Sequence, residues 1–310
     1  MGGAACEAIH PAYVRLEENG GVGWLNGFNE WLVRCGMTHN GAPGVDTDGK
    51  LKTLHGGLAN TPASFVQVSV GLEPPYFLSV QGVVFESSMF GPNLRLDTTM
   101  TTAPGANWLV IQDRITNMRS TPEECQMLYH INYGPPLLEK GSRLLTASDS
   151  ISPRDPYATK RMREWDVLDA PKSGRPEECY FIRPRADRNG YAVAGLRNKA
   201  GDLAVSHIFP VEALPYLTVW KNEGALEDGY VTGIEPGTNH PNFVGFERQQ
   251  GRIVKLGPGE SWHSDMTIIG HVGREEVSEL EKKIKAIQGG KKCEILLAPQ
   301  PGLSPQATTK

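Results

Sequence analysis

Two histidines and one glutamate are the residues of this sequence whose types and neighbours best suit chemistry. His55 lies in a Leu-His-Gly-Gly stretch, His130 in Tyr-His-Ile-Asn-Tyr-Gly, and Glu235 in Gly-Ile-Glu-Pro-Gly-Thr. Glycine lets the backbone come close to a ligand, and Gly, Pro and Asn favour loops and strand ends. Imidazole and carboxylate groups are the usual proton carriers of enzymes. We therefore expect the three side chains to meet in one polar pocket.

The local sequence makes Glu235 and His130 the stronger candidates for proton transfer. Glu235 ends an apolar run, where burial would raise the pKa of a carboxyl group towards the range of a general base. Because side chains alternate along a strand, Asn132 is expected on the same face as His130. Each residue also has a structural interpretation. His55 could be a turn histidine bonded to backbone, His130 a satisfied core histidine, and Glu235 the partner of a nearby Arg or Lys.

Four other side chains could line the same pocket. Arg34 and Lys221 lie among apolar residues, where each could donate to a ligand or extend to solvent. Trp165 and Trp220 could stack on a ligand, although buried Trp is commoner in cores. Cys35, in an apolar run, is predicted to be a core residue and not a nucleophile.

Short β-prone runs separated by turn residues make up most of the chain. The runs alternate in hydrophobicity and recur about every ten residues, which is typical of a β-sandwich. The predicted strands span residues 65–70, 76–80, 83–86, 94–99, 108–115, 191–196, 203–209, 217–221 and 266–271. A helix is predicted at 273–288, where apolar residues recur at helical spacing before Gly289. The sequence therefore predicts an all-β fold, a large antiparallel β-sandwich with a C-terminal helix.

Length and charge set the class of protein and of partner. The 310 residues, 39% of them hydrophobic, suffice for one large domain, which we place at 1–298, with a flexible tail at 299–310. Thirty-one basic and thirty-five acidic residues give a net charge of −4, and no basic run is interleaved with aromatics. This pattern argues against a nucleic-acid partner.

Cysteine usage and hydropathy indicate the compartment. No apolar run reaches the roughly 20 residues that span a bilayer, and residues 1–7 lack the features of a secretory leader. The five cysteines are scattered and include no Cys-x-x-Cys pair, which argues against a disulfide framework or a zinc knuckle. We expect a cytoplasmic protein with reduced thiols and no membrane partner.

Three stretches, in order, carry a family resemblance: Leu54–Gly57, Tyr129–Gly134 and Gly233–Thr238. Together they resemble the galactose mutarotase-like superfamily, which includes the aldose 1-epimerases. A bacterial branch of that superfamily, known as a domain of unknown function, is more similar still. The stretches that carry this closer likeness are Gly23–Phe28, Arg34–Met37, Ala59–Ala63, Pro153–Asp155 and Trp220–Lys221. The resemblance extends from about Glu7 to about Gly270.

The resemblance implies a β-sandwich with a small sugar bound in a cleft on its concave side. In the epimerases, a glutamate takes the proton of the anomeric hydroxyl, a histidine protonates the ring oxygen, and the opened sugar recloses on either face. Transferred to this sequence, Glu235 is the base, His130 the acid and His55 a second histidine that stabilises the ring oxygen. The resemblance implies no cofactor. Its further sugar-binding candidates are Arg34, Asn60, Asn132, Arg154, Asp155 and Lys221, and its candidates for a substrate-binding aspartate are Asp155, Asp202 and Asp228.

Two other functions are compatible with the same residues. Two His and one Glu could hold a divalent metal ion for epimerisation or isomerisation of a keto sugar, although no short His-x-His or His-x-x-Glu spacing supports such a site. A carbohydrate-binding protein without catalysis could keep the same cleft, because fold does not fix function.

The resemblance begins close to Met1, whereas relatives usually have further strands before it. We therefore expect one uncovered sheet edge, or a homo-oligomer in which a second subunit completes that edge.

Overall fold

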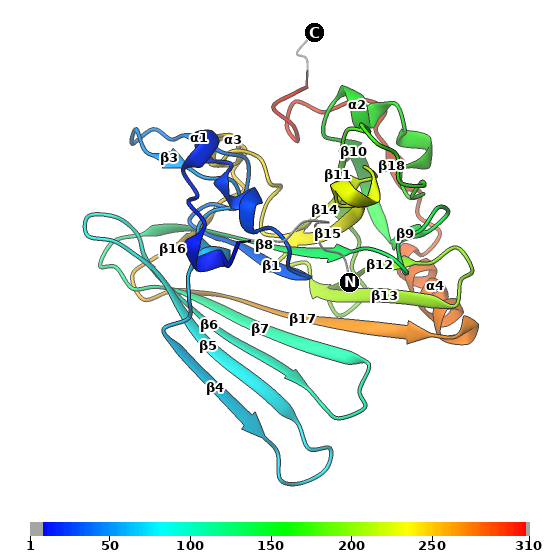
Figure 1. The fold of residues 1–310 in the computed structure, drawn as a ribbon, viewed down its shortest axis with the longest axis horizontal. Helices are drawn as coiled ribbons and strands as arrows, with labels where there is room; N and C mark the ends of the chain where they lie inside the picture. The colour runs from blue at the N-terminus through cyan, green and yellow to red at the C-terminus, as the bar shows by residue number, and fades with distance from the viewer. Residues whose placement is uncertain (1–8, 308–310) are drawn as a thin grey trace.

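Two large sheets stacked face to face form the body of the protein in the computed structural model, which describes residues 9–307 (Figure 1). All strand pairs are antiparallel except the short parallel pair β10 and β18. In spatial order the first sheet contains β1 (Leu32–Met37), β8 (Glu123–Tyr133), β15 (Val231–Gly237), β14 (Tyr216–Asn222), β11 (Glu178–Pro184), β10 (Ser148–Pro153) and β18 (Glu294–Ile295), with β16 (Val254–Leu256) paired to β8. The second contains β4 (Phe65–Val70), β5 (Leu78–Ser87), β6 (Asn93–Thr102), β7 (Trp108–Asn117), β17 (Ser261–Val272), β13 (Leu203–Pro210), β12 (Tyr191–Arg197) and β9 (Arg143–Thr146). The predicted antiparallel β-sandwich is confirmed.

Short elements connect the strands and cover one face of the first sheet. Strands β2 (Gly44–Val45) and β3 (Leu51–Lys52) form a separate hairpin. The helical elements are α1 (Glu18–Gly21), α2 (Pro156–Thr159), α3 (Val244–Gln249) and α4 (Arg274–Gln288), and the 3-10 turns are η1 (Pro11–Tyr13), η2 (Gly23–Gly27), η3 (Leu58–Asn60), η4 (Met162–Glu164) and η5 (Leu226–Asp228). No helix among residues 9–307 is long and apolar enough to cross a membrane.

The alternation of side chains along β8 shows how the first sheet is used on both faces. Tyr129 and Ile131 are fully buried in the core between the two sheets. Leu128, His130 and Asn132 therefore point to the opposite face, and Leu128 packs there in a second cluster under the N-terminal segment. Cys35 belongs to this second cluster, so its prediction as a core residue is confirmed.

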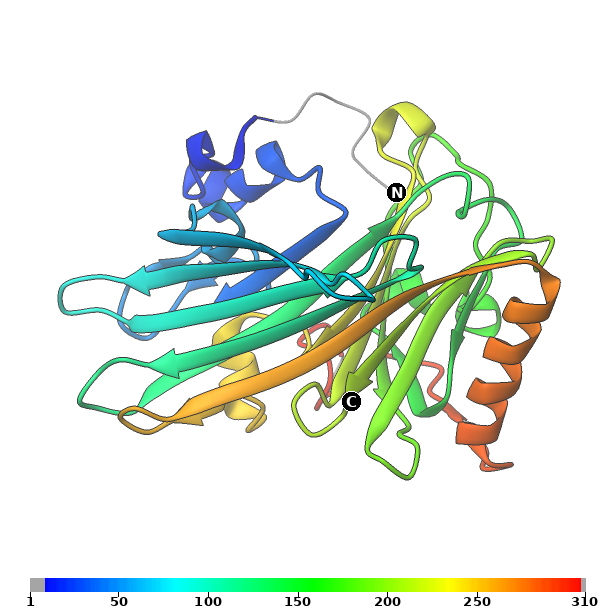
Figure 2. The same ribbon diagram turned by 90° about the horizontal axis from the view of Figure 1, so that it is seen from below.

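Helix α4 lies where the sequence predicted it, within one residue of the expected start. Its apolar stripe, Val277, Leu280 and Ile284, packs on the second sheet against a cluster that includes Val193 and Ala204. Figure 2 shows α4 at the end of the sandwich formed by β12 and β13. Helix α4 therefore covers the outer face of the second sheet. It does not contribute to the outer face of the first sheet.

Strand β4 is the edge of the second sheet and leaves apolar side chains in contact with solvent. Phe65, Val66, Val68 and Val70 are each more than half exposed, with values of 51% to 70%. Strand β4 pairs with β5 alone, so this edge of the sheet has no neighbouring strand among the described residues. A second subunit at this edge stays a prediction.

The segment expected to be a flexible tail lies against the domain as far as residue 307. Ser304 is buried, and its hydroxyl donates to the backbone carbonyl of Arg154. Asn242 Nδ2 donates to the carbonyl of Leu303 (3.0 Å) and Arg252 Nη1 to that of Gly302 (2.7 Å). Residues 308–310 lie outside the described residues.

The four described cysteines are free, and Cys6 lies outside the described residues.

Candidate active site

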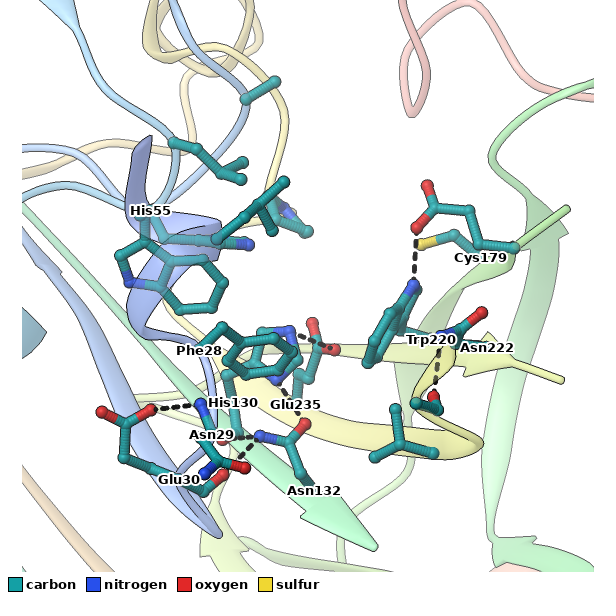
Figure 3. A pocket seen from close by; sticks show the side chains of 18 of the residues that line it. Phe28, Asn29, Glu30, His55, His130, Asn132, Cys179, Trp220, Asn222 and Glu235 are labelled. Atoms are coloured by element: carbon teal, nitrogen blue, oxygen red, sulfur yellow. Dashed lines mark hydrogen bonds and ion pairs between the residues drawn. The ribbon is translucent and has the colours of Figure 1, made fainter. Parts of the chain in front are cut away.

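A cavity of about 420 Å³ opens on the face of the first sheet that points away from the core. Strands β8, β15 and β14 form its floor, and the N-terminal segment forms one wall (Figure 3). The three residues singled out by the sequence, His55, His130 and Glu235, all line it. The structure thus brings together side chains that are separated by 75 and 105 positions in the sequence.

Glu235 and His130 touch at the bottom of the cavity. The distance between Glu235 Oε1 and His130 Nε2 is 3.3 Å, and both side chains are almost fully buried. Gly233 makes this contact possible, because a Cβ atom at that position would collide with Glu235 Oε1 and come within 3.2 Å of the His130 ring. Oε1 has no hydrogen-bond partner among the described residues. The carboxyl group is therefore available to His130 and to a ligand.

Asn132 determines which nitrogen of His130 carries a proton. Its Nδ2 donates to the backbone carbonyl of Glu30 (3.0 Å), so its Oδ1 is the atom that faces His130 Nδ1 (2.8 Å). An amide oxygen can only accept, so the proton must lie on Nδ1. The Nε2 lone pair is then directed at Glu235. The predicted shared orientation of His130 and Asn132 is found, and it fixes the tautomer of the imidazole.

Burial shifts the pKa values of the pair in opposite directions. Loss of solvent raises the pKa of Glu235 well above 4.5, and the negative charge of Glu177 raises it further while Arg154 opposes this. Loss of solvent also lowers the pKa of His130 well below 6.5, with a smaller contribution from His55 in the same direction. Both shifts disfavour charge. Because the two groups are in contact, they titrate together.

His55 lies beside His130, with the two ring centroids 5.4 Å apart, and has a strained backbone conformation. Its backbone has a φ of 60°, and its Nδ1 donates to the carbonyl of Asn40 (2.9 Å). Burial lowers the pKa of His55 from 6.5 to about 4, so the neutral ring presents the Nε2 lone pair to the cavity. Gly56 follows with a φ of 74°, and a side chain there would collide with the backbone carbonyls of Gly36 and His39. The glycine therefore brings the loop close to β1, and the expectation that it approaches a ligand was wrong.

Three aromatic side chains lie close to the ring of His130. The ring centroids of Phe28, Trp220 and Trp24 lie 5.2, 5.5 and 6.1 Å from that of His130. They exclude water, which strengthens the electrostatic interactions between the buried groups. Trp220, one of two predicted stacking residues, lines the cavity. The other, Trp165, packs against the core between the sheets.

Arg154 and Asn132 also line the cavity, as the resemblance implied. Arg154 is held by two carboxylates, Asp155 at 2.9 Å and Glu177 at 2.8 Å. Asp155 itself lies outside the lining residues and caps α2, because its Oδ1 accepts from the backbone of Tyr157 and Ala158.

The structure distinguishes the three candidates for a ligand-binding aspartate. Asp228, at the end of η5, lines the cavity. Asp202 bonds to Asn198 in the turn between β12 and β13, away from the cavity. With Asp155 engaged as a helix cap, the aspartate placed to meet a ligand is Asp228.

Arg34 and Lys221 lie outside the cavity, contrary to expectation. Arg34 alternates with Val33 and Cys35, which face the cavity side, so it points into the core and bonds Asp113 (2.6 Å). Lys221 follows Trp220 on β14 and therefore faces away from it. Its Nζ donates to the carbonyl of Val167 (2.9 Å).

Asn60 is the third candidate that the structure places elsewhere. It lies in η3, and its Nδ2 donates to the backbone carbonyl of Pro11 (3.1 Å). It holds the N-terminal segment in place and does not line the cavity.

Several residues of the site had little signal in the sequence. Glu177 is an exposed carboxylate just before β11, and nothing in its neighbours distinguishes it from other surface acids. Trp24 and Phe28 stood out as aromatics, but their irregular spacing did not indicate which face they cover. Gly233 could have been recognised, because a glycine inside a strand often marks a close approach of other atoms.

No group of three or more His, Cys, Asp or Glu within residues 9–307 is arranged to hold a metal ion. His55 and His130 each use Nδ1 for a protein acceptor.

Comparison with known proteins identifies the family. Residues 3–269 match the sequence model of "Domain of unknown function (DUF4432)". The chain belongs to this family. No curated protein matches the chain.

Solved structures show the fold that the DUF4432 chain shares. A protein from Klebsiella pneumoniae, described as a "putative aldose 1-epimerase", is 40% identical with a TM-score of 0.94, over 96% of this chain and 78% of that one. A galactose mutarotase-like protein from Clostridium acetobutylicum is 14% identical with a TM-score of 0.55, over 79% of this chain and 80% of that one. An Escherichia coli K12 protein that bears the same description as the first is 14% identical with a TM-score of 0.53, over 84% and 88%. The predicted galactose mutarotase-like fold is confirmed.

The position of Arg34 predicts a loss of stability on substitution. Arg34→Ala would leave Asp113, whose side chain is fully buried, without its ion pair, and breaking such a pair costs about 3–5 kcal/mol. Urea denaturation should show this loss while the affinity for sugar stays unchanged. Arg95→Ala, which breaks a partly exposed pair with Asp97, is the matched control and should cost less than about 1 kcal/mol. A variant of Arg34 that is stable but binds sugar poorly would support the expectation that Arg34 contacts the ligand.

The raised pKa of Glu235 predicts that Glu235→Gln becomes relatively more stable as pH rises. An unfolded glutamate has a pKa of about 4.3, and burial raises the folded value. The folded wild type therefore binds the proton more tightly and loses stability as pH rises above the unfolded pKa. The glutamine variant has no such loss. Melting temperatures measured from about pH 5 to about pH 8 should diverge in favour of the variant, whereas parallel curves would show that Glu235 ionises freely in the fold.

Proposed function

We propose that this protein interconverts the anomers of an aldose, as an aldose 1-epimerase does. The observation that carries the proposal is the contact between Glu235 and His130, two buried titratable groups at the floor of an open cavity. In this proposal the pair carries one proton between its two members. The description of the Klebsiella relative supports the same class of reaction.

The geometry of the pair suits a hemiacetal. The anomeric hydroxyl and the ring oxygen of an aldose are bonded to the same carbon, so two protein atoms 3.3 Å apart can each contact one of them. One group takes the hydroxyl proton, and the electrons of that O–H bond form the carbonyl. The bond between the anomeric carbon and the ring oxygen breaks, and the ring oxygen takes the proton of the other group. Rotation about the adjacent C–C bond and the reverse steps give the other anomer.

For Glu235 to act as the base, the shared proton must first lie on His130. Burial alone favours the neutral forms, with the proton on Glu235. A bound sugar changes this preference, because its hydroxyl donates to a carboxylate and its ring oxygen accepts from an imidazolium. The substrate therefore stabilises the arrangement in which Glu235 is the base and His130 the acid. Over one full cycle the proton returns to its starting position.

The role of His55 differs from the one that the resemblance implied. Its Nδ1 proton is engaged by Asn40, and its lowered pKa keeps the ring neutral. The Nε2 atom that faces the cavity can then accept a hydrogen bond but cannot donate one to a ring oxygen. We assign His55 to a sugar hydroxyl. Asn132, Arg154 and Asp228 supply further polar groups, and Trp220 supplies a flat apolar surface.

Substitution of the pair should abolish the exchange of anomers. Glu235→Gln keeps the shape of the side chain but cannot take a proton, so the rate should fall by about 10²–10⁴-fold. Gly233→Ala should also lower the rate, because its Cβ displaces the carboxyl group of Glu235. Anomer exchange of a panel of aldoses can be followed by NMR. Glu212→Gln, an exposed residue outside the cavity, is the control. Undiminished exchange in Glu235→Gln would refute the mechanism, and binding without exchange in the wild type would indicate a carbohydrate-binding protein.

The rate should be constant over a broad range of pH, because the active pair holds one proton throughout. On the acid side the pair takes up a second proton, and the lowered pKa of His130 places this limb below pH 6.5. On the alkaline side the pair loses its proton, and the raised pKa of Glu235 moves this limb well above pH 4.5. The profile of kcat/KM reports both limbs for the free enzyme. An acid limb centred above pH 6.5 would contradict this account.

A further inference from the structure

Glu177 stands at the rim of the cavity and bonds two of its lining residues. Its side chain is 47% exposed, yet neither oxygen is free of protein contacts. Oε2 accepts from the indole N–H of Trp220 at 2.7 Å, and Oε1 accepts from Nη2 of Arg154 at 2.8 Å. Figure 3 shows the first of these bonds, from the ring nitrogen of Trp220. An exposed acid held in this way has a defined position that an ordinary surface glutamate lacks.

Trp220 links the rim to the reacting pair. Its ring lies 5.5 Å from that of His130 and 5.9 Å from that of Phe28, and it is partly exposed to the cavity. Strand β14 fixes the backbone of Trp220, but the orientation of its ring depends on the contacts of the indole. The hydrogen bond to Glu177 is the polar contact that the indole makes among the described residues.

The charges around Glu177 leave little attraction for an anion. Among the described residues that line the cavity, Arg154 is the single cation. It is shared between Glu177 and Asp155, so its charge is already more than balanced. Asp228 adds another carboxylate at the rim. A ligand with a carboxylate or phosphate would meet net negative charge, whereas a neutral sugar would not.

We propose that Glu177 is a positioning and specificity residue. It holds the indole of Trp220 in the orientation that packs on the apolar face of a neutral aldose, and its negative charge disfavours the binding of anionic sugars. The inference rests on the proposed function of the same cavity. Glu177 does not touch the reacting atoms, so its effect through Trp220 is on affinity and not on the chemical step. Its charge is a second, separable influence on the site.

That second influence reaches Glu235 electrostatically. The groups that face Glu235 are His130 on β8, Cys35 on β1, Cys179 on β11, and the more distant Arg154 and Glu177. Burial keeps both thiols protonated, since it raises the pKa of each. Glu177 raises the pKa of Glu235, so Glu177→Gln should move the alkaline limb of the pH profile to lower pH. A purely structural role would leave that limb in place.

A double-mutant cycle tests whether Glu177 acts through Trp220. With D-galactose or D-glucose as the neutral probe, Glu177→Ala should raise KM about tenfold, the scale of one lost charge-assisted hydrogen bond, with kcat changed less than about twofold. Glu177→Gln keeps an acceptor for the indole and should restore most of the affinity. In a Trp220→Phe background, which lacks the N–H donor, Glu177→Ala should add little. Glu212→Ala is the matched control. A full additional effect in that background, or an unchanged KM, would overturn the proposal.

Binding measurements separate this inference from the proposed function. Titration calorimetry with D-galactose and D-glucuronate gives Kd values that do not depend on turnover. Glu177→Gln should narrow the preference for the neutral sugar over the uronate by about tenfold, and an unchanged ratio would refute the specificity role. If the wild type binds D-galactose but exchanges no anomers, the proposed function fails and these Kd values still decide the role of Glu177. If the wild type exchanges anomers and the variants match it, the inference alone fails. A wild type that binds neither sugar overturns both.

Discussion

The contact between a buried carboxyl group and a buried imidazole is the constraint on which the rest of the site depends. Removing Glu235 and His130 from water is costly for the charged form of each, and the structure places the two buried groups 3.3 Å apart. The contact needs two adjacent strands, a glycine at position 233 to make room, and a cover over the outer face of the sheet. The aromatic rings of Trp24 and Phe28 supply that cover. The N-terminal segment is therefore as necessary to this contact as the strands themselves.

A sheet that is buried on both faces explains where the charged residues lie. On β8 and β14, successive side chains face the core and the cavity in turn. A shift of one position along the strand therefore moves a residue from the cavity to the core. Arg34 and Lys221 fall on the core side, and each is satisfied there, by Asp113 and by backbone carbonyls. A charged residue in an apolar strand thus indicates that it has a partner, but not which face it occupies.

The strand pattern, helix α4 and the shared face of His130 and Asn132 could all be predicted because they depend on local periodicity. The meeting of His55, His130 and Glu235 was expected from their residue types and their Gly-, Pro- and Asn-rich neighbours. The family resemblance supported this expectation, because no local rule pairs residues so far apart. Arg34 was misplaced because its face depends on the register between β1 and β8, which the sequence does not reveal. Glu177 was missed because its role comes from two partners, Trp220 and Arg154, that reach it through the tertiary fold.

Two residues at the rim of the cavity, Glu177 and Arg154, act electrostatically on Glu235 without touching it. Glu177 raises the pKa of Glu235 and Arg154 lowers it, and these two rim residues are bonded to each other. The hydrogen bond between them holds both charges in place relative to Glu235. A sugar that displaced either residue from the other would change the proton affinity of the pair at the moment of binding. The backbone of Arg154 is held in turn by Ser304, so the C-terminal segment, far from the reacting atoms, contributes to keeping that balance fixed.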